Sequence, residues 1–312
     1  MKKNVSAALL LLAVMVLALL SRLVNFSEGM TRENVYLTVI LINLVVFVLP
    51  GIFYTRLQAP GGSYIKESNF RLIGFSGIPV ILFLFFVMVS GSVLLNYLLY
   101  RIGWLDLSAV SYVSEYAFLS GGYEGFVQVL LSGLAFGVVP AVTEEFFFRG
   151  VFMSEYRSYG GAAQVLLPAI AFALVHFSAP QLPVYFFGGL VLSLCAYITR
   201  SCVAAMILHV LYNLFALFLE SFVWNLIAQR SSTAFFVFLV MTIFLLFLML
   251  ALGEGERLYY NYAVSGIPAP KEKKKQPGRM RPFFEALTSP VLLLCVALFV
   301  IVVLVQVGTS AA

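Results

Sequence analysis

The chain has 312 residues, of which 62% are hydrophobic and 11% charged, and its formal net charge is +5. Ordinary soluble domains are about half apolar and about a quarter charged, so this composition excludes a water-soluble globular protein. Apolar runs of about 18 residues or more match the thickness of a bilayer. The composition therefore predicts an all-α fold, a polytopic transmembrane helix bundle of about eight to nine spans.

Nine apolar runs follow one another and are separated by short polar breaks. They cover residues 5–24, 35–55, 72–100, 125–152, 161–178, 182–199, 201–222, 232–253 and 286–308. The first run follows Lys2 and Lys3, as in a signal peptide, but no A-x-A-like cleavage site follows it, which favours a retained helix. The third run carries Pro79, which predicts a kink or a tilt.

The order of these runs suggests three parts. Residues 1–124 hold about three spans, residues 125–224 hold the polar motifs described below, and residues 225–312 hold the last spans with a basic loop at 254–285. The three cysteines form no CxxC pair and are interpreted as small packing residues: Cys195, Cys202 and Cys295.

The placement of lysine and arginine predicts the orientation. The densest basic run, Lys271–Pro282, has six positive charges and one negative, and such loops stay in the cytoplasm. Eight of the predicted spans precede it, so the N-terminus is expected on the same side, and the loop 102–124, without lysine or arginine, outside. Arg22, Arg32 and Arg230 do not fit this pattern. The basic run is interpreted as a loop near anionic lipid, and no nucleic-acid partner is expected.

Ionisable residues interrupt the apolar fourth run in the stretch "TEEFFFRG", Thr143–Gly150. Charges inside a bilayer are costly and usually mark function. On a helix, Glu145 and Arg149 are four residues apart and share a face, so they can form an ion pair. Glu144 lies about 100° around the helix from Glu145, so it is free to point elsewhere.

The only two histidines both lie in predicted spans, in "FALVH", Phe172–His176, and "HVLYN", His209–Asn213. Helix counting puts Glu144 and His209 at a similar depth, about 12 Å from the cytoplasmic edge, but His176 at about 22 Å. The three meet only if the segment from Gly160 dips inward or the helix tilts. A carboxylate, two imidazoles and an amide suit activation of water and binding of an oxyanion, which is amide hydrolysis without a nucleophilic side chain.

These three motifs resemble those of one family. "EEFFFR" fits E-E-x-x-x-R, "FALVH" fits F-x-x-x-H and "HVLYN" fits H-x-x-x-N of the CAAX protease and bacteriocin-processing (CPBP, also called Abi) family, in the family's order. The resemblance covers roughly residues 125–224. The family includes the type II CAAX prenyl endopeptidases, and it implies a helical membrane bundle with its active site in a cytoplasm-facing cavity.

The resemblance also implies roles for individual residues. Glu144 and His176 would activate water, and His209 and Asn213 would bind the oxyanion. Supporting roles would fall to Glu145, Arg149 and Phe172.

Whether the site uses a metal is open. The family has been described both as metalloproteases and as glutamate proteases. Glu144, His176 and His209 could bind one Zn²⁺ ion and leave a position for water. HExxH, the usual motif of zinc proteases, is absent.

Other functions fit the sequence less well. An aspartyl protease needs two aspartates, and this chain has only Asp106. "GFSG", Gly74–Gly77, suggests a rhomboid-like serine protease but leaves the glutamate pair unexplained. The remaining alternative is a non-catalytic membrane scaffold or bacteriocin-immunity protein that retains the motifs. The expected setting is a bacterial cytoplasmic membrane, and the expected substrate is a peptide or protein, including one anchored in the membrane.

Overall fold

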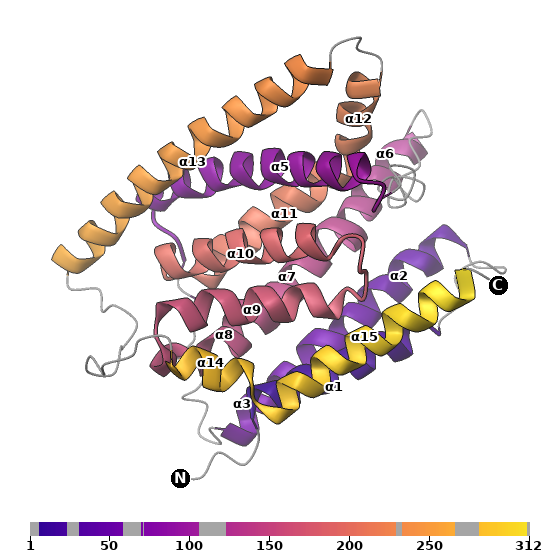
Figure 1. The fold of residues 1–312 in the computed structure, drawn as a ribbon, viewed down its shortest axis with the longest axis vertical. Coiled ribbons are helices and arrows are strands. Elements are labelled where there is room, and N and C mark those ends of the chain that lie inside the picture. Colours follow the sequence, from indigo (N-terminus) through magenta and orange to yellow (C-terminus); the bar gives the residue numbers. More distant parts are fainter. Residues whose placement is uncertain are drawn as a thin grey trace.

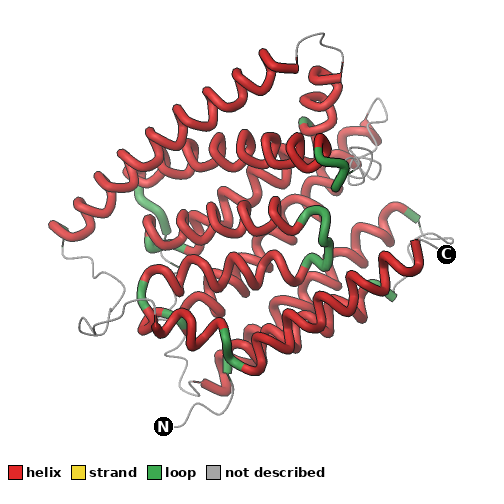
Figure 2. Tube along the Cα trace, in the orientation of Figure 1, coloured by secondary structure: helices red, strands yellow, loops and turns green. Residues whose placement is uncertain are grey.

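The computed structural model describes residues 6–23, 31–58, 70, 72–105, 123–228, 233–265 and 281–310. Within these ranges every regular element is a helix and none is a strand, which confirms the all-α prediction (Figure 2). Most of the basic run Lys271–Pro282 and most of the loop 102–124 lie outside the described residues.

Several helices are built from consecutive pieces. The first half of the chain contains α1 (Ala7–Ser21), the continuous set α2 (Arg32–Asn43), η1 (Leu44–Val48) and α3 (Leu49–Gln58), the short turn η2 (Phe75–Gly77) and α5 (Ile78–Arg101). The next long helix consists of α6 (Tyr123–Ser132), η4 (Gly133–Val138), α7 (Val139–Glu145), η5 (Phe146–Phe152) and α8 (Met153–Glu155). The rest comprises η6 (Arg157–Tyr159), α9 (Gly161–Val175), α10 (Leu182–Thr199), α11 (Cys202–Phe218), α12 (Glu220–Ala228), α13 (Thr233–Val264), α14 (Arg281–Leu287) and α15 (Pro290–Ser310).

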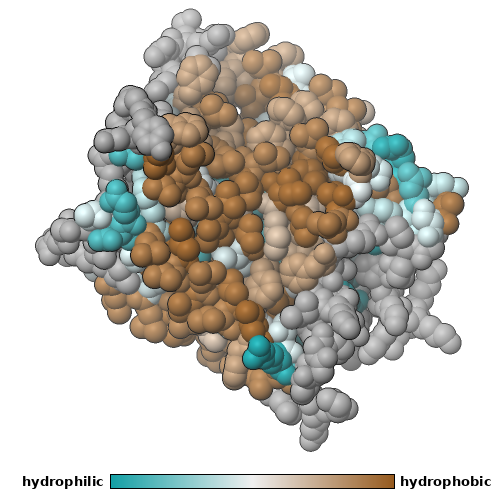
Figure 3. Space-filling model, turned by 180° about the vertical axis from the view of Figure 1, so that it is seen from behind, coloured by the Kyte–Doolittle hydropathy of each residue, from teal (hydrophilic) through white to brown (hydrophobic). Residues whose placement is uncertain are grey.

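Six of these helices are long and apolar enough to cross a membrane, and α1, α9 and α11 are shorter apolar helices. The long helices lie roughly side by side, and the chain runs back and forth between the left and right sides of Figure 1. Large apolar side chains such as Phe53, Phe238 and Met249 are exposed. Figure 3 shows a broad hydrophobic surface with hydrophilic residues gathered near its edges. The protein is therefore an integral membrane protein whose outer surface faces lipid.

All nine predicted apolar runs form helices, and the run 182–199 matches α10 at both ends, whereas the bounds of the others differ from the predicted ones. At about 1.5 Å per residue, the 15 residues of α9 reach about 22 Å, less than the roughly 30 Å of a hydrocarbon core. The helix ends where Phe177 adopts a left-handed φ of 47°. By contrast α13, predicted to end at 253, continues to Val264. The short helices α12 and α14 were not predicted.

The prediction that Pro79 kinks the third span is wrong. The structure places Pro79 in the first turn of α5, where no helical hydrogen bond is lost because the first four amides have no partner inside the helix. Proline there starts the helix and does not bend it.

The helix with the acidic pair contains two π-helical segments, η4 and η5, on either side of α7. A π segment widens the turn and rotates the residues after it relative to an α-helix, and such segments are frequent at functional sites. The apolar periodicity of residues 125–152 gives no sign of them.

Close packing in the middle of the bundle joins α9 to α10. A Cβ atom on Gly189 would lie 3.0 Å from the Cα of Ala169, so only glycine lets these two backbones approach this closely. The helix α1 is also packed inside the bundle: its Leu11, Val14 and Met15 are fully buried, and it contacts α15. The main core includes residues from all three predicted parts of the chain.

Candidate active site

The acidic pair divides as the helix geometry predicts. Glu145 is fully buried, and its Oε1 accepts a hydrogen bond from Nη1 of Arg149 at 2.6 Å. Arg149 also donates from Nη2 to the carbonyl of Gly189 at 2.8 Å and from Nε to Oγ of Ser193 at 3.4 Å. Its guanidinium lies 5.0 Å from the centroid of the Phe172 ring. The arginine is thus fixed by α10 and α9 as well as by its own helix, and it holds the Glu145 carboxylate in place.

The same carboxylate oxygen has a second partner that the sequence did not indicate. Nδ1 of His209 lies 2.9 Å from Oε1 of Glu145. A carboxylate accepts, so this nitrogen donates, which fixes the ring and leaves Nε2 free. His209 sits on α11, which is capped at its start by the side chain of Ser201. Glu145 therefore connects the helix of the acidic pair to the helix of the second histidine.

His176 lies at the end of α9, where its Nδ1 is 2.7 Å from the carbonyl oxygen of Phe172. A carbonyl oxygen can only accept, so Nδ1 carries the proton and Nε2 of the neutral ring has a lone pair. The ring stacks on Tyr185 with centroids 3.9 Å apart and contacts Phe172 at 4.7 Å. The predicted neighbour Phe172 is thus found beside His176. Tyr185 was missed, because nothing in its local sequence sets it apart from the other tyrosines.

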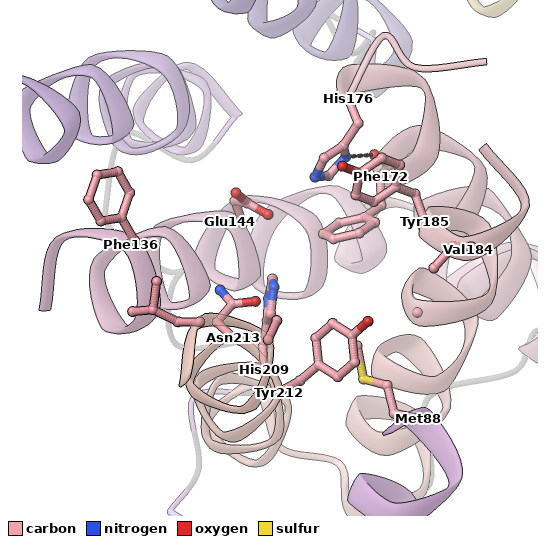
Figure 4. A pocket seen from close by; sticks show the side chains of 13 residues that line it. Met88, Phe136, Glu144, Phe172, His176, Val184, Tyr185, His209, Tyr212 and Asn213 are labelled. Carbon is pink, nitrogen blue, oxygen red and sulfur yellow. Dashed lines mark hydrogen bonds between the residues drawn. The ribbon is translucent and has the colours of Figure 1, made fainter. Parts of the chain in front are cut away.

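Glu144 points away from the ion pair. No hydrogen bond or ion pair joins it to another side chain in the described part of the molecule. Figure 4 shows its carboxylate directed into the space shared with His176, His209 and Asn213. The amide nitrogen of Asn213 donates to the carbonyl of Gly137 at 3.3 Å, which uses one of its two N–H groups.

These four residues line one cavity of about 180 Å³. That volume has room for several water molecules. The remaining lining is mostly apolar and comes from five helices: Met88, Phe136, Phe172, Val184, Tyr185, Gly188, Tyr212, Ala216 and Leu217. Ser76 of the "GFSG" stretch is in the turn before α5 and does not line this cavity.

The mismatch in depth for His176 becomes smaller in the structure. The helix that carries Glu144 continues to Glu155, beyond the predicted residue 152, so Glu144 lies about 16 Å from its end. The five residues before α9 form a tight turn that includes η6. His176 is about 22 Å along α9, and the remaining difference is small enough for both side chains to line the same cavity.

No group of three or more His, Cys, Asp or Glu side chains in the described ranges is placed to hold a metal ion. The two histidines also each use Nδ1 for a protein hydrogen bond, which leaves one nitrogen apiece. Binding of Zn²⁺ by Glu144, His176 and His209 would need these side chains to come closer together than they do here.

The arrangement is one of buried and half-buried polar residues on three helices around a small cavity in a membrane bundle. Residues 126–215 match the family model described as type II CAAX prenyl endopeptidase, Rce1-like. The match confirms the family resemblance inferred from the motifs, and it contains every predicted site residue. No curated protein and no solved structure matches the chain. The Rce1-like segment covers less than a third of the 312 residues. It supports a protease that acts on a peptide or protein substrate.

Proposed function

We propose that the protein is an intramembrane endopeptidase that hydrolyses a peptide bond with water activated by Glu144 and His176. The observation that carries this proposal is the cavity lined jointly by Glu144, His176, His209 and Asn213, which lie on three helices of the Rce1-like segment. Among the described residues, the other ionisable side chains that line the cavity are those of Tyr185 and Tyr212.

Glu144 is suited to be the general base. Its carboxylate has no protein partner to satisfy it within the described ranges, and it faces a cavity with room for water. The unprotonated Nε2 of His176 can accept a second hydrogen bond from the same water and so orient it. Stacking on Tyr185 and the bond to Phe172 keep the imidazole ring in one orientation.

His209 and Asn213 are suited to stabilise the negative charge that develops on the carbonyl oxygen. Because Nδ1 of His209 is bound to Glu145, Nε2 is the atom left for the substrate, and when it carries a proton it can donate to the oxyanion. Asn213 retains one N–H group for the same purpose. Both residues are held by bonds to the helix that carries Glu144.

Hydrolysis of the peptide bond consumes one water molecule. The water oxygen attacks the carbonyl carbon while its proton moves to Glu144, and a tetrahedral oxyanion forms beside His209 and Asn213. When the C–N bond breaks, the protonated Glu144 gives its proton to the leaving nitrogen. The products are a carboxylic acid and an amine, and Glu144 is an ionised carboxylate again. This mechanism uses no metal ion.

A comparison of membrane-derived peptides from cells that express the wild type or Glu144→Gln tests the proposal. Glutamine has nearly the same shape but cannot take the proton, so cleavage products should disappear. Glu254→Gln is the matched control, since Glu254 is another glutamate of the bundle, is paired with Arg257 on α13 and does not line the cavity. Products that persist in the Glu144→Gln cells would refute the mechanism and favour the non-catalytic scaffold.

A further inference from the structure

The cavity extends in one direction only from the layer of Glu144 and His209. Phe136 precedes Glu144 by about 12 Å of helix, and Ala216 follows His209 by about 10 Å. The two helices run in opposite directions, so both displacements point the same way, toward the right-hand side of Figure 1. Val184 and Tyr185, in the first turn of α10, and His176, at the end of α9, lie at this end as well.

In the opposite direction the protein is closed. Next to the site lie Arg149, Phe148 and Phe152, each at most 1% exposed, and on α11 the fully buried Ala205 and Cys202. Interiors of this kind are as densely packed as organic crystals. None of these five residues lines the cavity, so in the described part of the molecule this layer separates Glu144 from the opposite ends of the helices.

The closed side is the basic side of the molecule. Arg56 near the end of α3, Arg157 after α8 and Arg257 on the last turns of α13 belong to it. Among the described residues, Arg200 at the end of α10 belongs to it as well, whereas Arg22, Arg32 and Arg101 lie at the other ends of the helices. In the sequence, the densest basic run is the one that follows α13. By the positive-inside rule the basic side is cytoplasmic.

One of these exceptions, Arg22, makes a contact that explains its position. Nη2 of Arg22 donates to the carbonyl oxygen of His176 at 2.7 Å, and its guanidinium lies 5.3 Å from the centroid of the Phe177 ring. A cation at the carboxyl end of a helix is favourable. Arg22 therefore stabilises the end of α9, and its place does not weaken the orientation.

From these observations we infer that the cavity receives its substrate from the non-cytoplasmic half of the membrane. From sequence we expected both a cytoplasmic basic loop and a cytoplasm-facing cavity, and in this packing the two exclude each other. The lining that the described residues provide contains one carboxylate, Glu144, and no lysine or arginine. The fitting occupant is an exported or membrane-anchored polypeptide with uncharged, apolar residues at the cleaved bond. The occupant is a substrate only if the proposed function holds.

Cysteine accessibility in cells that express the full-length protein tests the inference. Two alanines of α11 flank His209: Ala216 lines the cavity, and Ala205 lies in the closed layer. Ala216→Cys and Ala205→Cys form a matched pair for a small, membrane-impermeant sulfonated methanethiosulfonate. Side markers are Ile102→Cys after α5, 61% exposed, and Tyr260→Cys near the end of α13, 68% exposed. The native cysteines are fully buried and give the background.

In intact cells the reagent should modify Ile102→Cys and Ala216→Cys, and it should modify Tyr260→Cys only after permeabilisation. Ala205→Cys should stay unmodified in both conditions. Modification of Ala216→Cys that appears only together with that of Tyr260→Cys overturns the inference, and so does an Ala216→Cys that reacts from neither side. Accessibility does not depend on catalysis. A protein that shows the expected labelling but no cleavage would refute the proposed function and leave the access route standing.

Discussion

Replacing Glu145 by glutamine probes the division of labour within the acidic pair. The Glu145 carboxylate is fully buried and is shared by Arg149 and His209 through the same oxygen. Glutamine keeps an acceptor oxygen but removes the negative charge. Arg149, 1% exposed, would then face only neutral acceptors, namely the carbonyl of Gly189 and the hydroxyl of Ser193.

The magnitude follows from this burial. Removing one partner of a buried ion pair costs about 3–5 kcal/mol, and since the amide oxygen still accepts, we take the lower end, about 3 kcal/mol. For a chain of this size each kcal/mol lowers Tm by roughly 2–4 °C, so Glu145→Gln should lower Tm by about 6–12 °C. Glu144→Gln should leave Tm within about 2 °C, because Glu144 lines a cavity and has no ion-pair partner to lose.

Thermal unfolding of the purified variants in one detergent measures both changes, and cleavage assays on the same samples measure activity. Both variants should lose cleavage, but only Glu145→Gln should lose stability. The double variant Glu145→Gln/Arg149→Met removes the unpaired charge and should recover part of the lost Tm. Equal Tm changes for the two single variants would refute the division, and a double variant that is no more stable than Glu145→Gln would refute the ion-pair explanation.

Three further predictions concern the residues that position the site. Gly189→Ala should lower Tm and folded yield, since its Cβ would lie 3.0 Å from a backbone atom of α9, whereas Gly253→Ala, with no atom within 4 Å, should be neutral in the same melting assay. Tyr185→Leu should lower the cleavage rate by about tenfold, the equivalent of a lost aromatic stack, and Tyr185→Phe should keep it. A Tyr185→Phe variant as slow as Tyr185→Leu would indicate that the hydroxyl, not the stacked ring, matters. Arg22→Gln should lower the cleavage rate more than Arg101→Gln does, because Arg22 binds the carbonyl of His176, whereas Arg101 contacts Tyr97 of its own helix. Equal rates in the two variants would show that Arg22 does not position His176.

Much of the fold was predictable because a bilayer leaves the chain few options. Backbone N–H and C=O groups in lipid have no water to bind, so they must form hydrogen bonds within their own segment. Long apolar runs therefore form helices. The helix spacing of Glu145 and Arg149 likewise predicts their ion pair, since residues four apart share one face. Such features depend on local sequence and on a periodicity that tertiary contacts do not alter.

The features of the fold and the site that could not be predicted from the sequence depend on contacts between distant segments. The bond from His209 to Glu145 joins residues 64 positions apart, and Tyr185 stacks on a histidine of another helix. Neither contact can be recognised from the residues next to it in the sequence. Pro79 shows the same limit, because its effect depends on whether it falls in the first turn or in the middle of a helix. The side on which the cavity opens depends on which layer is filled with side chains, and no helix count predicts that.

The two ends of the chain take part in holding the turn that positions His176, although the Rce1-like segment contains neither. Phe177 has a φ of 47°, which is unfavourable for a residue with a Cβ atom and persists only when the surroundings hold it. Its ring is 1% exposed and stacks on Phe299 of α15 at 6.4 Å. The side-chain amide of Gln306 on α15 can be oriented so that both its nitrogen and its oxygen form hydrogen bonds. In this orientation the nitrogen donates to the carbonyl of Phe177 at 3.1 Å, and the oxygen accepts from Nη1 of Arg22 at 2.8 Å. Since Arg22 in turn holds the carbonyl of His176, the helices α1 and α15 fix the end of α9 together. The matched segment alone therefore carries the proposed reactive groups but not all the contacts that orient His176, and the proposed chemistry requires the outer helices to be in place.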